Sequence, residues 1–273
     1  MTIVWRKNMP SQYEMDYAAL VADIMVNGDE RPTRNHPTKA VFGRMLTVHE
    51  LCYGEFPILQ GRKMYPTGVF GELAAFLKGP KSVQDFKDEG CNYWDKFGDE
   101  NGYIHVDYGN SWLDFNGVNQ LEAVLTSLSE DPNGRRHIIS GWRPNMLSEL
   151  TLPCCHLLYQ WYVNGDSLEM IWYQRSVDTM IGLPSDVILA AAWNILMADQ
   201  LGLNPGKLVF MLGDTHIYKS HHIDVADYLD VVPMTHNSCP QYFYEGTIDT
   251  FNKDSISLLG YDPYAPIGFE LHD

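Results

Sequence analysis

Residues 187–201 form a stretch in which almost every side chain is apolar, and the stretch ends at Gly202. A helix that is apolar around its whole circumference has no face that can be left in water. We therefore expect this stretch to be a buried central helix, with the other elements packed around it.

The rest of the chain mixes helical and strand patterns. Apolar residues recur at helical spacing in three further stretches, 13–26, 66–77 and 118–128. Runs rich in β-favouring residues predict four strands, at 40–48, 157–163, 167–173 and 209–212. Asn164-Gly165-Asp166 separates two of them and is a strong hairpin signal. The polar stretch 29–39 is expected to be a loop, and the mixture predicts one α+β domain over residues 1–273.

Charge and cysteine content exclude several classes of function. The formal net charge of -16 disfavours a nucleic acid polymer, although a few arginines can still hold a small phosphate ester. Five cysteines without paired spacing predict free thiols, and no CxxC or HExxH motif indicates a metal site. No apolar run approaches the roughly 20 residues of a membrane span, so we expect a cytoplasmic protein with no membrane partner.

Residues 152–186 hold a thiol, an arginine and a carboxylate, at Cys155, Arg175 and Asp186. This combination suits covalent chemistry on an anionic heterocycle. Taken alone, Cys154-Cys155-His156 is more typical of small buried residues than of a nucleophile. The interpretation therefore depends on the motifs around it.

These motifs resemble, in order and spacing, the signature of the thymidylate synthase family. They are Leu152-Pro153-Cys154-Cys155-His156, Tyr173-Gln174-Arg175-Ser176, Gly182-Leu183-Pro184 and Gly213-Asp214-Thr215-His216-Ile217-Tyr218. Shorter runs extend the resemblance over all but about the first dozen and last six residues, among them Gly71-Glu72-Leu73, Tyr93-Trp94-Asp95, Tyr108-Gly109 and Arg135-Arg136. The resemblance implies an α+β domain with a large mixed β-sheet flanked by helices, a symmetric homodimer, and a pyrimidine nucleotide monophosphate as substrate.

The resemblance also implies catalytic roles. Cys155 matches the thiol that adds to C6 of the pyrimidine, which makes C5 able to attack a one-carbon electrophile. A nearby arginine, Arg175, is expected to lower the pKa of this thiol. Glu72 matches the general acid and base, and Tyr108 matches the residue linked to removal of the C5 proton. His156, beside the nucleophile, is also assigned to the catalytic set.

Substrate and folate contacts follow from the same resemblance. The phosphate grip corresponds to Arg34, Arg175 and Ser176, with Arg135 and Arg136 supplied in trans by the partner chain. Arg31 can substitute for Arg34, because the loop is one residue shorter here than in the family. The remaining nucleotide contacts are Gln174 and, for the sugar hydroxyl, His216 and Tyr218.

The implied one-carbon donor is 5,10-methylenetetrahydrofolate, and no metal is implied. Its pocket corresponds to Trp94, Leu152, Asp178 and Gly182. Considered without the resemblance, a tryptophan such as Trp94 is more often a core residue.

Asp186 stands where a thymidylate synthase has asparagine. An asparagine amide accepts from uracil N3–H and donates to O4, whereas cytosine presents an N3 acceptor and an amino donor. A carboxylate accepts from that amino group, and a protonated Asp186 can deliver a proton to N3 as Cys155 adds to C6. The alternative is that Ser185 and Asp186 only cap the helix expected at 187–201. We favour base selection, so Asp186 completes the predicted catalytic residues.

The family branch with aspartate at this position is deoxycytidylate (dCMP) hydroxymethylase, known from large DNA bacteriophages. Water attack on the exocyclic methylene would give 5-hydroxymethyl-dCMP, whereas hydride transfer from tetrahydrofolate would give 5-methyl-dCMP. The tail 268–273 is more polar than the apolar end of a synthase, which favours water. Trp94 and residues 99–102 are closer to synthases and keep reduction open. Further alternatives are a thymidylate synthase acting on dUMP and an inactive member that binds nucleotide as a regulator.

Overall fold

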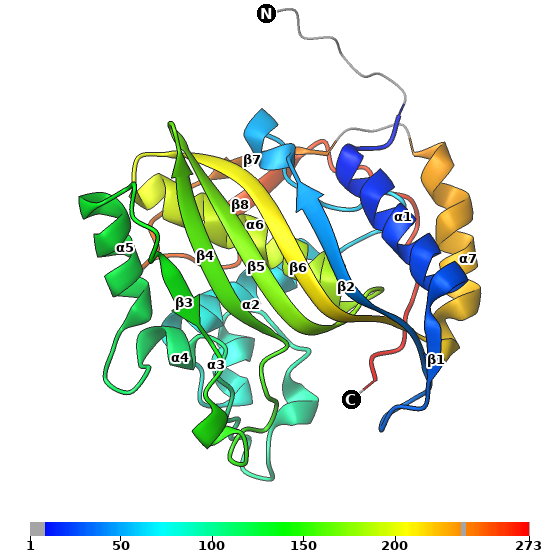
Figure 1. Ribbon diagram of the computed structural model, residues 1–273, viewed down its shortest axis with the longest axis horizontal. Helices are drawn as coiled ribbons and strands as arrows, with labels where there is room; N and C mark the ends of the chain where they lie inside the picture. The colour runs from blue at the N-terminus through cyan, green and yellow to red at the C-terminus, as the bar shows by residue number, and fades with distance from the viewer. Residues whose placement is uncertain (1–8, 236–238, 273) are drawn as a thin grey trace, which may run out of the picture.

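A six-stranded sheet in the order β1-β2-β6-β5-β4-β3 organises the protein, and a separate two-stranded sheet lies behind it in the view of Figure 1. The computed structural model describes residues 9–235 and 239–272. β5 and β6 run parallel and the other neighbouring strands run antiparallel, so the large sheet is mixed. The strands are β1 (Asp29–Arg31), β2 (Thr38–Val48), β3 (Ile138–Ser140), β4 (His156–Asn164), β5 (Ser167–Asp178), β6 (Asn204–Tyr218), β7 (Gln241–Tyr244) and β8 (Ile256–Leu259).

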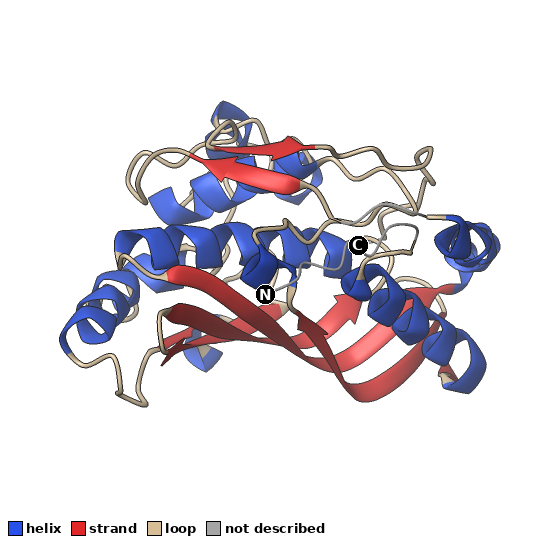
Figure 2. Ribbon diagram, turned by 90° about the horizontal axis from the view of Figure 1, so that it is seen from above, coloured by secondary structure: helices blue, strands red, loops and turns tan. Residues whose placement is uncertain are grey.

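The longer helices gather on one face of the large sheet and leave its opposite face largely uncovered (Figure 2). Among the described residues, none of the helices has the length and apolar content needed to cross a bilayer. The helices are α1 (Gln12–Asn27), α2 (Pro66–Lys78), α3 (Val83–Asp88), α4 (Asn110–Leu113), α5 (Gln120–Glu130), α6 (Gly182–Gln200) and α7 (His222–Val231).

The central helix, α6, is buried as its sequence predicts. Every residue from 187 to 198 is buried. Trp193 stacks on Trp112 of α4 with ring centroids 4.0 Å apart, and it meets Trp161 of β4 edge-on at 5.1 Å. Large aromatic rings therefore fill the space between α6, the sheet and α4.

The start of α6 corrects the expected boundary at residue 187. The helix begins at Gly182 and so includes Pro184. The proline is tolerated because it lies in the first turn, where its missing N–H costs no intrahelical hydrogen bond. Asp178 instead accepts the backbone N–H groups of Met180 and Ile181, at 2.8 and 3.3 Å. Ser185 and Asp186 therefore do not cap this helix, which excludes the alternative that capping is their only role.

Two other segments differ from the sequence-based expectation. β6 extends far beyond the predicted 209–212, because it pairs with β2 on one side and β5 on the other. The expected loop 29–39 contains β1 and the start of β2, and β1 was not marked by any apolar pattern because its three residues are exposed. The predicted β-hairpin and the predicted helices α1, α2 and α5 are confirmed.

The uncovered face of the sheet carries a row of apolar side chains. Met211 of β6 is in register with Met45 of β2 and Tyr173 of β5, and Tyr173 is in register with Leu158 of β4. Met45 is 65% exposed and Met211 is 41% exposed. Apolar side chains exposed in a continuous row across four strands favour an interaction surface.

Replacing Trp193 with alanine should reduce the free energy of unfolding by about 3–5 kcal/mol, because the change leaves a cavity among packed rings. Chemical denaturation monitored by circular dichroism measures this loss. Ile223→Ala is the control, since Ile223 is 79% exposed on α7 and its truncation should cost less than about 0.5 kcal/mol. Similar losses for both variants would contradict the central role of α6.

Candidate active site

The predicted nucleophile lies where the loop before β4 meets β5. The backbone N–H of Cys155 donates to the hydroxyl of Tyr108 at 2.5 Å, and the backbone N–H of Arg175 donates to the Cys155 carbonyl oxygen at 2.9 Å. Arg175 also donates through Nε to the Cys154 carbonyl oxygen at 2.7 Å, and its Nη2 lies 3.9 Å from Cys155 Sγ. The thiol, the arginine and the tyrosine are thus brought together as expected.

The protonation state of Cys155 differs from the simplest expectation. Burial raises the pKa of the thiol, Arg175 opposes this effect, and the nearby Asp186 adds to it. Burial outweighs the arginine, so the cysteine is held as a thiol in this state of the protein. Forming the thiolate requires a proton acceptor or a change in the surroundings.

Glu72 projects from α2 and is only 9% exposed. Tyr93 Oη donates to Glu72 Oε2 at 2.7 Å, and Trp94 Nε1 donates to Glu72 Oε1 at 2.7 Å. Burial raises the pKa of Glu72 to about 7, although the two donors oppose the rise. A carboxyl group with this pKa can both give and take a proton near neutral pH.

Asp186 lies in the first turns of α6 and faces β5. Gln174 Nε2 donates to Asp186 Oδ2 at 2.6 Å. Burial, followed by the nearby charge of Glu72, raises the pKa of Asp186 well above its usual value. The raised pKa favours the neutral carboxylic acid form, which can donate one hydrogen bond and accept others.

His156 lies 3.8 Å from this acid, measured from Nε2 to Asp186 Oδ1. Burial lowers the pKa of His156 to about 3, and its Nδ1 is 2.6 Å from the hydroxyl of Tyr159. The two groups do not form an ion pair at neutral pH, because a histidine with a pKa of about 3 is uncharged there. Together with Gln174 they make a buried polar wall beside Cys155.

The predicted folate residues flank this wall. Asp178 Oδ2 is buried without a hydrogen-bond partner, while Oδ1 is used by the backbone before α6. A buried free acceptor of this kind fits a ligand rich in N–H donors, as a pterin is. Gly182 adjoins Asp178, since a Cβ at Gly182 would lie 4.0 Å from Asp178 Cβ. Leu152 is half-buried and bridges to Val106.

Trp94 is largely a core residue. It is 5% exposed and stacks on Phe86 at 4.7 Å between ring centroids. Its polar contact is the hydrogen bond to Glu72, so the structure connects Trp94 to the predicted acid and base more directly than to an open pocket wall.

The predicted sugar and phosphate residues lie in two places. His216 and Tyr218 adjoin each other on β6. Ser176 of β5 is in register with Asp214 of β6. Arg31 Nη1 is paired with Asp214 Oδ2 at 3.0 Å. Burial raises the pKa of Tyr218, and the charge of Arg34 opposes this rise. The structure places Arg135 and Arg136, both exposed, before β3 at the opposite edge of the sheet (Figure 1).

The polar tail contacts the region beyond β6. Glu270 offers its carbonyl oxygen to His221 Nε2 at 2.8 Å, and Ser220 Oγ is 2.8 Å from His272 Nε2. The Phe269 ring lies 4.8 Å from the Arg62 guanidinium. Asp273, the last residue of the tail, lies outside the described residues.

Two contacts near the site were missed from sequence. Tyr93 was recognised only as part of a motif, and it bonds to a glutamate 21 positions earlier. Arg143 forms a buried ion pair with Asp107, the residue before Tyr108. No sequence pattern connects the partners of these contacts. The one available signal was that Tyr93 directly precedes Trp94, a predicted site residue.

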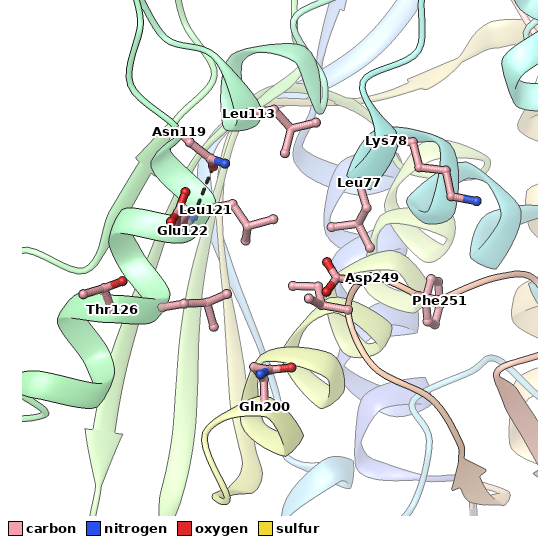
Figure 3. A pocket seen from close by; sticks show the side chains of 12 residues that line it. Leu77, Lys78, Leu113, Asn119, Leu121, Glu122, Thr126, Gln200, Asp249 and Phe251 are labelled. Atoms are coloured by element: carbon pink, nitrogen blue, oxygen red, sulfur yellow. Dashed lines mark hydrogen bonds between the residues drawn. The ribbon is translucent and has the colours of Figure 1, made fainter.

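A cavity of about 530 Å³ lies elsewhere, between α2, α5, α6 and residues 248–251 (Figure 3). None of the predicted site residues lines it. Over the residues that the structure describes, no group of three or more His, Cys, Asp or Glu side chains could hold a metal ion. The polar wall around Cys155 is therefore the candidate active site.

Comparison with known proteins agrees with this geometry. The profile of the family described as thymidylate synthase matches residues 15–272. A thymidylate synthase of Corynebacterium aurimucosum is 31% identical over 265 residues, which cover 95% of this chain and 98% of that protein. The chain therefore belongs to the thymidylate synthase family, whose members are folate-dependent one-carbon transferases that act on pyrimidine nucleotide monophosphates with methylenetetrahydrofolate as co-substrate.

Proposed function

We propose that this enzyme is a dCMP hydroxymethylase that makes 5-hydroxymethyl-dCMP. The observation that carries the proposal is Asp186, a carboxyl group beside Cys155 that accepts from Gln174 at 2.6 Å and whose pKa is raised by burial. A neutral carboxylic acid can donate to cytosine N3 and accept from the exocyclic amino group. Gln174 Nε2 occupies Oδ2 as a donor, which favours the acidic proton on Oδ1.

The raised pKa of Asp186 also suits the covalent step. As Cys155 Sγ bonds to C6, electrons move into the ring toward N3, and the acid proton of Asp186 can follow them. The N3-protonated adduct is neutral, and the resulting Asp186 carboxylate then accepts hydrogen bonds from its N3–H and amino groups. The proton from the Cys155 thiol must be taken up separately, and Glu72, with a pKa of about 7, is a suitable base.

Methylenetetrahydrofolate supplies the one-carbon unit to C5, and Asp178 Oδ2 and Gly182 are the residues proposed to hold its pterin. Tyr108, hydrogen-bonded to the Cys155 backbone, is placed to assist removal of the C5 proton. Tetrahydrofolate leaves the methylene carbon and takes the proton held by Glu72. Water then attacks the exocyclic methylene and its proton passes to Glu72. N3 returns its proton to Asp186, and Cys155 leaves C6 as the ring double bond returns. The polar tail and the ionisable Glu72 support water attack over hydride transfer, the step that would give 5-methyl-dCMP.

A homodimer joined through the uncovered sheet face completes the proposal. The apolar row of Met45, Met211, Tyr173 and Leu158 is self-complementary in kind, which suits an isologous interface. Arg34 and the Arg135–Arg136 pair lie at opposite edges of a six-stranded sheet, a separation of about 20 Å at strand spacing. Both can serve one phosphate only if two chains contribute.

On the phosphate side, Arg34 is preferred to Arg31. Burial raises the pKa of Tyr218 and the charge of Arg34 opposes this rise, so Arg34 lies near a residue of the predicted nucleotide site. The cytoplasmic location and a bacteriophage origin rest on the sequence reasoning alone.

Replacing Asp186 with asparagine should shift the ratio of kcat/KM for dCMP to that for dUMP toward dUMP by at least about 100-fold. The amide matches uracil and cannot deliver a proton to cytosine N3. Steady-state assays with both nucleotides measure the ratio. Ser185→Ala is the matched control and should leave the preference unchanged. A variant that still strongly prefers dCMP would refute the assigned role of Asp186.

Mixing two inactive variants tests the trans arginines. Arg135→Ala/Arg136→Ala dimers and Cys155→Ser dimers should each be nearly inactive. After subunit exchange, half of the dimers are mixed and each has one complete site, so about a quarter of wild-type activity should return. No recovery, despite mixed dimers detected by native mass spectrometry, would mean that the arginines do not act in trans.

A further inference from the structure

Tyr93 combines an exposed ring with a buried hydroxyl. The residue is 41% exposed, yet its Oη lies 2.7 Å from Glu72 Oε2. The ring packs against α2 where Gly68 leaves room, since a Cβ there would be 3.5 Å from Tyr93 Cε1. A second acceptor, the Gly68 carbonyl oxygen, lies 3.5 Å from the same hydroxyl.

The two donors to Glu72 are chemically different. The Trp94 indole N–H can only donate, whereas a tyrosine hydroxyl can donate and accept. While Glu72 is ionised, both groups donate to it, one to each oxygen. When Glu72 takes up a proton, Oε1 still faces the Trp94 N–H and cannot carry that proton toward it. Oε2 can carry it, because Tyr93 Oη can accept while its own hydrogen turns to the Gly68 carbonyl oxygen.

We propose that Tyr93 is a positioning residue that fixes the exchangeable proton of Glu72 on Oε2 and adjusts its hydroxyl to both charge states of Glu72. For the final step this inference rests on the proposed hydroxymethylation. There the water oxygen bonds to the exocyclic methylene and a water proton moves to Glu72 Oε2. The electron pair of the methylene double bond enters the ring and then expels Cys155 Sγ from C6.

The titratable groups around Glu72 leave it as the one that changes charge near neutral pH. Tyr93 and Cys91 face it from the segment after α3, and Asp186 faces it from α6. Burial raises the pKa of all three, so the Cys91 thiol and the Tyr93 hydroxyl stay protonated at neutral pH and the protonated form of Asp186 is favoured. Hydrogen bonds from Tyr93 and Trp94 lower the pKa of Glu72 against the effect of burial. Loss of the Tyr93 hydroxyl should therefore raise it further.

Tyr93→Phe tests the proposal. The titration of Glu72, followed by infrared difference spectroscopy with Glu72→Gln as the spectral blank, should move up by about one pH unit. The acidic limb of the pH profile of kcat should move by the same amount, lowering the rate at pH 7 roughly fivefold. Tyr103→Phe, which removes the hydroxyl of an exposed tyrosine further along the chain, should change neither quantity.

An unchanged infrared titration in a Tyr93→Phe protein with wild-type thermal unfolding would overturn the inference. So would a uniform fall in kcat with no shift of the pH profile, which is what a merely structural role predicts. If the Tyr93→Phe substitution destabilises the fold, infrared spectra of the wild type at low and high pH still test whether Tyr93 bonds to protonated Glu72. They must contain a protonated carboxyl band that responds to isotope labelling of tyrosine. If the wild type instead forms 5-methyl-dCMP, the proposed function fails while the infrared test of Tyr93 still stands.

Discussion

Burial of two neighbouring carboxyl groups, one of them beside the Cys155 thiol, is the constraint on which the site depends. Glu72 and Asp186 come from α2 and α6, two helices that pack against each other. Burial is the main cause of the raised pKa of each carboxyl group. The charge of Glu72 adds to the effect on Asp186. Two carboxylates so placed resist being ionised together, so their proton transfers are coupled.

The burial of Asp186 follows from its place near the start of the apolar central helix α6. The side chains of α6 from residue 187 onward fill the core, and Asp186 is the polar residue immediately before them. Its neighbours Gln174 and His156 come from β5 and β4, which are held in register by the hairpin at residues 164–167. The same packing that stabilises the domain therefore removes water from the acid that is proposed to read the base.

Sequence reasoning recovers the elements whose patterns are strong. The buried helix, the hairpin and the amphipathic helices α1, α2 and α5 follow from apolar spacing and turn residues. The start of α6 does not, because Pro184 suggests a segment before a helix, although it is tolerated within the first turn. The length of β6 is hidden because side chains on its uncovered side interrupt the apolar run.

The site divides in a similar way. Family motifs lead directly to Cys155, Glu72, Arg175 and Asp186, and the structure brings all of these into one region. Hydrogen bonds between distant segments, such as Tyr93 to Glu72 and Gln174 to Asp186, have no sequence signature because they arise from packing. Protonation states also depend on burial, which is why the raised pKa of the Cys155 thiol could not be foreseen from Arg175 alone.

The most direct measurement is the mass of the nucleotide formed when the wild-type protein is incubated with methylenetetrahydrofolate and either dCMP or dUMP. The proposed chemistry predicts that dCMP gains CH2O and that tetrahydrofolate is released. Gain of CH2 with formation of dihydrofolate would contradict water attack, and product from dUMP alone would contradict base selection by Asp186.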